Sequence, residues 1–168
     1  GPIPTKNVEV NGDLMEVMSR LYWMTGDASY REWCYRLMDY YSFHEPLLKL
    51  STISLRDHGC EIIAGMSEVY FVAAREDRAR WEKYKPPMHA LLDAILAKGV
   101  NEDGLMPSWF NPATGEKASE PLSDGWGYVY NAFLTVAHAD GDERYHQAVE
   151  HPLVNIHKYR DYQWGSSA

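Results

Sequence analysis

A repeated order of long loop, helix, short turn and helix constrains the fold of this chain more than any other feature. The first unit turns at Gly26-Asp27-Ala28-Ser29-Tyr30 and the third at Gly141-Asp142-Glu143-Arg144-Tyr145. Glycine tolerates the positive φ that ends a helix, and the following aspartate can cap the next helix. The pattern therefore places the short turns at one end of the helices and the long loops at the other, where we expect any functional site.

Apolar residues recurring every three to four positions predict six helices. They cover residues 13–24, 28–41, 58–74, 77–98, 124–139 and 143–158. Prolines 86, 87 and 152 are expected to kink or break the fourth and sixth helices. In the connection 99–123, segments 105–110 and 116–119 favour a small β-hairpin. The sequence thus predicts an all-α fold of three consecutive αα-hairpins, each about 50 residues long.

The hairpins divide the chain into three parts. Residues 1–11 are predicted to be an extended leader, since Pro2 and Pro4 disfavour helix, and Gly1-Pro2 resembles a protease-cleavage remnant. Residues 12–158 form the αα-hairpin repeat domain. Residues 159–168 form a polar tail in which Tyr159, Tyr162 and Trp164 are able to dock on the domain.

Composition excludes several classes of function. The net charge of −8 argues against a nucleic-acid partner, because phosphates require a basic surface. No apolar run approaches the roughly 20 residues that span a bilayer, and no signal-peptide pattern opens the chain. We therefore expect a soluble protein, cytoplasmic or periplasmic, without a membrane partner. Cys34 and Cys60 are expected to be free, buried thiols that do not fix the compartment.

Aromatic residues are unusually frequent, with six Trp and twelve Tyr. Core packing is one explanation, because these rings bury a large apolar area. A platform for sugar rings is the other, since the C–H faces of sugars stack on indole and phenol.

Two stretches carry a resemblance to a known family: Leu55-Arg56-Asp57-His58-Gly59-Cys60-Glu61 and the segment 123–132, Ser-Asp-Gly-Trp-Gly-Tyr-Val-Tyr-Asn-Ala. With the Gly-Asp turns, they resemble the inner-helix openings of bacterial (α/α)6 toroid, or six-hairpin, carbohydrate-active enzymes. That family includes glycoside hydrolases and polysaccharide lyases that act on uronate-containing glycans. A full toroid has six hairpins, so this chain resembles a fragment of about half a toroid. The resemblance implies an exposed apolar flank that would favour self-association.

The first candidate cluster opens the third predicted helix. Asp57 can cap that helix, and Glu61 complements the positive end of its dipole. In the functional interpretation, Asp57, His58 or Glu61 serves as general acid or base on the long-loop rim. Arg56 would then bind a substrate carboxylate in fork geometry.

The second candidate cluster opens the fifth predicted helix. Asp124 can act as an N-cap, or as a second catalytic carboxyl group. Two glycines in one turn, at 125 and 127, cost about 1 kcal/mol each relative to alanine, which a close ligand or helix would explain. Trp126 and Tyr128 could stack on a sugar, and Asn131 offers an amide one turn deeper. Trp109, in the long connection, could flank the same cleft.

These clusters support a carbohydrate-active enzyme that works by general acid/base chemistry, and four interpretations stay open. Two carboxyl groups would serve a glycoside hydrolase, whereas a lyase would use His58 or Tyr128 as base with Arg56 neutralising a uronate. A non-catalytic hairpin module that binds a protein or a glycan is the alternative. A toroid enzyme that acts on a terpenoid-like molecule is a further, weaker alternative. We expect no cofactor and no metal, because His58 and Glu61 have no obvious third ligand.

Overall fold

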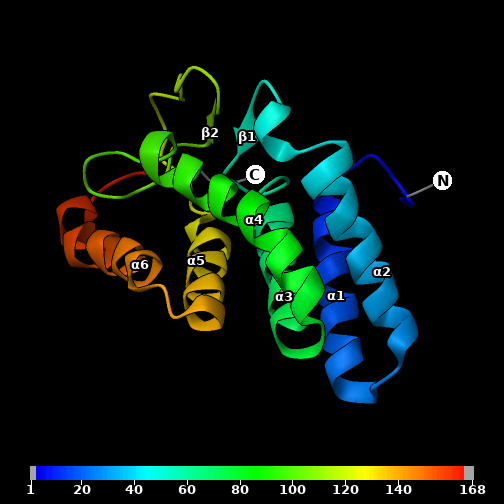
Figure 1. Cartoon of the computed structure of the whole chain (residues 1–168). Coiled ribbons are helices and arrows are strands. Elements are labelled where there is room, and N and C mark those ends of the chain that lie inside the picture. Colours follow the sequence, from blue (N-terminus) through cyan, green and yellow to red (C-terminus); the bar gives the residue numbers. More distant parts are fainter. Residues whose placement is uncertain (1–2, 165–168) are drawn as a thin grey trace.

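The structure, a computed structural model, describes residues 3–164; Gly1-Pro2 and residues 165–168 of the predicted tail lie outside the described residues. The fold is all-α, as predicted, and its helices pair into three αα-hairpins (Figure 1). The helices are α1 (Val8–Thr25), α2 (Ala28–Asp39), α3 (Glu61–Glu76), α4 (Arg78–Lys98), α5 (Trp126–Asp140) and α6 (Glu143–Asn155). Two short strands, β1 (Ile53–Ser54) and β2 (Trp109–Phe110), pair antiparallel.

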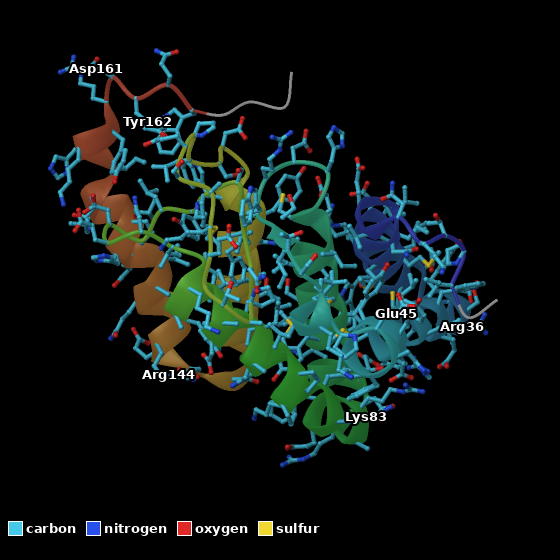
Figure 2. The ribbon with its side chains drawn as sticks, turned by 90° about the horizontal axis from the view of Figure 1, so that it is seen from above. Arg36, Glu45, Lys83, Arg144, Asp161 and Tyr162 are labelled. Carbon is cyan, nitrogen blue, oxygen red and sulfur yellow. The ribbon has the colours of Figure 1, made fainter. Side chains whose placement is uncertain are left out.

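The helices form two layers. Helix α3 is central and packs against both α1 and α5, while α2, α4 and α6 each pack on their hairpin partner. Seen from above, Arg36 of α2, Lys83 of α4 and Arg144 of α6 lie at the periphery (Figure 2). We therefore call α1, α3 and α5 the inner helices, and their surface turned away from α2, α4 and α6 the inner face. The inner face carries the candidate site.

The short turns have the predicted geometry. Gly26 and Gly141 adopt left-handed conformations, with φ of 71° and 69°. Asp27 caps α2 by accepting from the Ser29 amide at 2.8 Å, and Asp142 caps α6 by accepting from the Arg144 amide at 3.0 Å. All three short turns lie at one end of the hairpins, opposite the long loops (Figure 1).

The inner helices begin at other residues than predicted. The extended leader ends earlier, since Asn7 caps α1 and its Oδ1 accepts from the Val10 amide at 3.1 Å. Helix α3 begins three residues later than expected, because His58 has a φ of 65° that no α-helix accommodates. Cys60, and not Asp57, is the N-cap of α3; Gly125, and not Asp124, is that of α5.

The prolines and the long connection also modify the prediction. Helices α4 and α6 run through their prolines without a break. The predicted β-hairpin forms hydrogen bonds from the Ala118 amide to the Trp109 carbonyl and from the Asn111 amide to the Glu116 carbonyl. Its first arm also pairs with β1, in register Ile53 to Phe110, which the sequence pattern did not indicate. This pairing ties two long loops together beside the opening of α3.

The core takes up much of the aromatic content. Its largest fully buried side chains include Tyr70, Tyr84, Phe133 and Tyr145. In the tail, the Tyr162 hydroxyl accepts from the Leu122 amide at 2.7 Å, so the tail does dock on the domain. Across residues 3–164, no helix combines the length and the apolar character required to cross a bilayer.

Candidate functional site

The openings of α3 and α5 meet at one place on the long-loop side. The Ser123 hydroxyl donates to the Leu55 carbonyl at 2.8 Å and accepts from the Gly125 amide at 3.0 Å. A Cβ atom on Gly125 would lie 3.2 Å from Cys60 Sγ and 3.3 Å from the Arg56 Cα atom. Gly125 is therefore a glycine because the start of α5 rests directly on the loop that leads into α3.

The loop before α3 is held by its own carboxylates. The His58 amide donates to Asp57 Oδ1 and to Glu61 Oε1, both at 3.1 Å. Its imidazole Nδ1 lies 2.8 Å from Oε1 of Glu9 in α1, which raises the pKa of His58. The positive φ of His58 thus turns its ring toward α1, and the ring remains largely exposed.

Glu61, the first residue of α3, is the buried acid beside this loop, with 4% of its surface exposed. Burial raises its pKa, and its interaction with the Asp57 carboxyl group raises it further. Its Oε2 atom accepts no hydrogen bond from the part of the chain that the structure describes. An acid in such surroundings retains its proton to higher pH than usual, which suits a proton donor.

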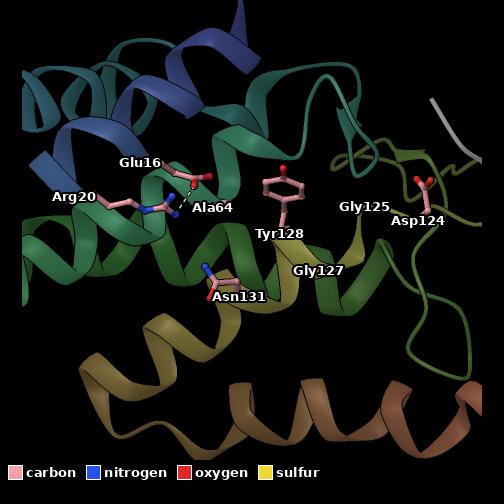
Figure 3. Close-up of a pocket in the computed structure, with 8 residues that line it drawn as sticks. All are labelled: Glu16, Arg20, Ala64, Asp124, Gly125, Gly127, Tyr128 and Asn131. Atoms are coloured by element: carbon pink, nitrogen blue, oxygen red, sulfur yellow. Dashed lines mark hydrogen bonds and ion pairs between the residues drawn. The ribbon is translucent and has the colours of Figure 1, made fainter. Parts of the chain in front are cut away.

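A cavity of about 320 Å³ opens on the inner face, between α1 and α5 and above α3 (Figure 3). Its lining residues are Glu16, Arg20, Ala64, Asp124, Gly125, Gly127, Tyr128 and Asn131. Glu16 and Arg20 come from α1 and lie toward one end, Asp124 lies at the other, and the Tyr128 ring stands between them (Figure 3). Because 46% of Tyr128 is exposed, its ring is available to a ligand.

A second cavity of about 300 Å³ continues the first along the inner face. Both cavities share Asn131, and the second is otherwise lined by Glu68 and Phe71 of α3 and by Leu134, Thr135 and His138 of α5. Together they form one groove along α5, floored by α3. We call this surface the inner groove; a ligand longer than one sugar residue could extend along it.

Carboxylates dominate the electrostatics of the inner groove. Arg20 Nη2 lies 2.7 Å from Glu16 Oε2 and 3.2 Å from Glu68 Oε1. Even so, burial raises the pKa of Glu16, and the nearby Glu68 and Asp13 raise it further. The pKa of Tyr128 is raised by burial and by Cys60, Glu16, Glu61 and Asp13, so these groups share one electrostatic neighbourhood.

The structure separates the predicted site residues into three groups. Asp124, Tyr128 and Asn131 line the cavity. Arg56, Asp57 and His58 belong to the loop that supports its mouth, and Glu61 is the first residue of the helix that follows this loop. Trp126 is half-buried and packs on Tyr130 and Trp164, with ring centroids 5.6 and 6.3 Å apart. Trp109 pairs with Ser54 in the small sheet. Neither tryptophan lines the inner groove.

Sequence reasoning missed the α1 wall of the cavity, formed by Glu16 and Arg20. The sequence does contain a pattern that indicates this wall. Glu16 and Arg20 are four residues apart and therefore lie on one helix face, which they share with Asp13. That face resembles an ordinary solvated surface until α1 is placed beside α3. In residues 3–164, no group of three or more His, Cys, Asp or Glu side chains is arranged to hold a metal ion.

Comparisons with known proteins do not assign this chain to a family. No protein-family model matches the chain, and neither curated proteins nor solved structures give a significant match. Any function must therefore be argued from the inner groove itself.

Proposed function

We propose that this protein is carbohydrate-active, that its inner groove binds a glycan, and that carboxyl groups at the α3 and α5 openings hydrolyse it. The observation that carries the proposal is that Glu61, a buried acid of raised pKa, lies next to the mouth of a cavity lined by the exposed ring of Tyr128. Glu61 and Asp124 lie on two segments that touch at Gly125, and Tyr128 lines the cavity together with Gly125 and Asp124. Binding clefts typically combine such a ring with a few polar groups.

In this proposal each residue has a distinct role. Tyr128 stacks on a sugar ring, and the Asn131 amide hydrogen bonds to a hydroxyl group. Glu61 donates a proton to the leaving oxygen, since its pKa is raised, and Asp124 activates water or attacks the anomeric carbon. The proton passes from the Glu61 carboxyl group to the departing alcohol, and water then supplies the hydroxyl group of the new reducing end.

The lyase alternative is less compatible with the charges present. A lyase would bind a uronate carboxylate near Arg56, with His58 or Tyr128 as base. His58 is already paired with Glu9, and the groove side of α1 and α3 carries several acids that repel a uronate. Hydrolysis of a glycan without carboxylates is therefore the reaction we favour.

A non-catalytic binding module is the second candidate, and one observation favours it. Glu61 is buried beneath the mouth and does not line the cavity, so its carboxyl group must gain access to a bound sugar before it can act. If it does not, the inner groove would bind a glycan without cleaving it.

We also propose that the three hairpins correspond to about half of an (α/α)6 toroid. Apolar side chains exposed on α1 and α6 support the self-association that this implies. Met24 on α1 is 81% exposed and Val154 on α6 is 71% exposed. Sedimentation of the chain over a range of concentrations tests this point, and a monomer at all concentrations would contradict it.

A panel of oligosaccharides tests the enzymatic proposal. Neutral, amine-bearing and uronate-containing oligomers are incubated with the protein, reading new reducing ends for hydrolysis and absorbance of unsaturated product for elimination. Asp124→Asn and Glu61→Gln should each lower hydrolysis by about 10²- to 10⁴-fold. Glu32→Gln, on the outer helix α2, is the matched control and should leave it unchanged. Glycan binding without new reducing ends would contradict the hydrolase and support the non-catalytic binding module. If no oligosaccharide binds, both candidate functions are contradicted.

A further inference from the structure

Helix α1 departs from the usual pattern of a helix on the surface of a domain. Its buried side packs on its neighbours, with Gly12 against α3 and with Met15 and Ser19 against Cys34 of α2. The helix stands at one end of the row of inner helices, with α3 between it and α5 (Figure 1). The opposite side of such a helix is normally polar, because it faces water. In α1 that side is apolar.

The outward side of α1 carries apolar residues at a regular spacing. They follow one another at alternating intervals of four and three positions: Val10, Leu14, Val17, Leu21 and Met24. The valines are 42% and 50% exposed, the methionine is 81% exposed, and the two leucines are half-buried. This spacing forms a continuous seam along a helix, and it is the pattern by which two helices pack side chains between each other's side chains. We call these five residues the α1 seam, and we conclude that its shape fits another helix.

One flank of the α1 seam carries two opposite charges, Asp13 and Arg20. Asp13 is exposed, and its side chain forms no ion pair within residues 3–164. Partial burial and the charges of Glu9 and Asp57 raise the pKa of Asp13, so its surroundings lack a cation.

Arg20 has donors left for a further carboxylate. Its side chain is 58% exposed, and its ion pairs with Glu16 and Glu68 both use the nitrogen Nη2. A guanidinium group carries five N–H donors, and Nε and Nη1 of Arg20 bind no group in the described part of the chain. Arg20 can therefore bind another acid without releasing the two that it holds.

The orientation of a helix pair follows from these flank charges. An antiparallel pair of identical helices brings the same flank of both together, because a two-fold axis relates them. Asp13 of one copy then approaches the partner's Arg20. A parallel pair brings opposite flanks together, and the flank opposite to Asp13 has only uncharged residues: Asn11, Met18 and Thr25.

The charges also select the register of the antiparallel pair. With Leu14 beside the partner's Val17, each Asp13 lies close to the partner's Arg20, and symmetry forms this ion pair twice. With Leu21 beside the partner's Val17, the two Arg20 side chains meet and repel each other. Charge complementarity therefore favours the first register.

We infer that two copies of this chain pair through α1, antiparallel about a two-fold axis, with Leu14 beside the partner's Val17 and Asp13 beside the partner's Arg20. This inference rests on the self-association proposed above, to which it assigns a surface and a register, and it is independent of glycan hydrolysis. Because Arg20 lines the cavity, the pairing adds the partner's Asp13 to the rim of each inner groove. Ring closure by two half-toroids would instead place α1 against the partner's α5–α6 edge, where Val154 is exposed.

Sedimentation equilibrium of the full chain tests the surface, and we expect a monomer–dimer equilibrium. Val17→Glu should raise its dissociation constant by about 100-fold or more, because two like charges enter an apolar seam. Val154→Glu on α6 is the matched control and should leave the constant unchanged. Both valines are exposed, so both variants should keep the fold, which circular dichroism checks. A dimer weakened by Val154→Glu and not by Val17→Glu would be a closed ring and would overturn the inference.

A double-mutant cycle tests the register. Asp13→Asn and Arg20→Gln should each weaken the dimer by about tenfold, and the double variant by no more than either alone, because both remove the same ion pair. Glu32→Gln, at an exposed acid of α2, should have no effect. Additive losses, or a dimer indifferent to Asp13→Asn, would overturn the inferred pairing. A chain that stays monomeric at every concentration would overturn it together with the proposed self-association and leave glycan binding standing.

Discussion

Gly12 of α1 and Gly65 of α3 lie directly on each other's helix. A Cβ atom on Gly65 would lie 2.4 Å from the Gly12 carbonyl oxygen, and one on Gly12 would lie 2.4 Å from the Glu61 carbonyl carbon. No side chain fits between two backbones at this separation. This contact brings the Glu16 wall of the cavity beside α3, so the inner groove depends on two glycines that contribute nothing to it chemically.

Gly65→Ala should therefore destabilise the protein. Alanine gains about 1 kcal/mol of helix propensity over glycine, but forcing α1 away from α3 costs about 1–3 kcal/mol or more. We expect a net decrease in the free energy of unfolding, measured by urea titration. Gly127→Ala on α5 is the matched control, since its added Cβ would meet no atom within 4 Å beyond its chain neighbours and the backbone of its own helix, and it should not destabilise the protein. Equal effects at the two positions would contradict the close packing of α1 on α3.

Asp140, at the end of α5, holds three helices together at the short-turn side. Its side chain is 4% exposed, and it accepts from the Tyr70 hydroxyl at 2.7 Å and from Trp81 Nε1 at 3.1 Å. His89 Nε2 lies 2.6 Å away. Burial and this carboxylate raise the pKa of Tyr70. The carboxylate therefore has partners on α3 and α4, and its removal leaves several donors unsatisfied.

Asp140→Ala should lower the free energy of unfolding by about 3 kcal/mol, because buried polar partners lose their acceptor. Tyr70→Phe removes one hydrogen bond and should cost about 1 kcal/mol. Both values come from chemical denaturation monitored by circular dichroism. Tyr30→Phe, at the half-buried start of α2, should change stability by less than about 0.5 kcal/mol. An Asp140→Ala variant as stable as the parent chain would show that the network adds nothing.

The turns were predictable from sequence because their chemistry is local. Glycine followed by aspartate fixes a left-handed residue and a cap within two positions, whatever the rest of the chain does. The starts of the inner helices were not predictable in this way. Residues 1–11 were expected to be an extended leader, yet Gly12 lies inside α1 and is buried against the backbone of α3. The α1 wall was missed for the same reason: Glu16 becomes part of a site only through long-range packing.

The pair of His58 and Glu9 should be visible in a titration by nuclear magnetic resonance. Because the Glu9 carboxylate stabilises the imidazolium, His58 should titrate with a pKa above its ordinary 6.5. A raised pKa means that the pair stabilises the fold fully below pH 6.5 and that this contribution is lost as the pH rises through the folded value. Glu9→Gln should return the midpoint toward 6.5, whereas Glu32→Gln should not move it. A His58 midpoint that is insensitive to Glu9→Gln would exclude the pair.

Glu61→Gln separates a structural role of this acid from a chemical one. The pKa of Glu61 is raised above its ordinary 4.5, so the folded state binds the proton more tightly than the unfolded state. Its ionisation therefore destabilises the fold progressively as the pH rises from about 4.5 through the folded value. Glutamine keeps an acceptor for the His58 amide without the charge. The variant should consequently be more stable than the parent near neutral pH, with a flatter dependence of stability on pH.

If Glu61 is the proton donor, the same variant should gain stability and lose hydrolysis, a combination that damage to the fold cannot produce. Thermal unfolding and reducing-end release are measured on one preparation across the acidic range. Glu68→Gln, on the same helix and paired with Arg20, serves as the comparison. A Glu61→Gln protein that is less stable than the parent at neutral pH would mean that the carboxylate is needed in its charged form. Glu61 would then be a structural anion that holds the loop before α3, and the acid of the site would have to be sought at Asp124 or Glu16.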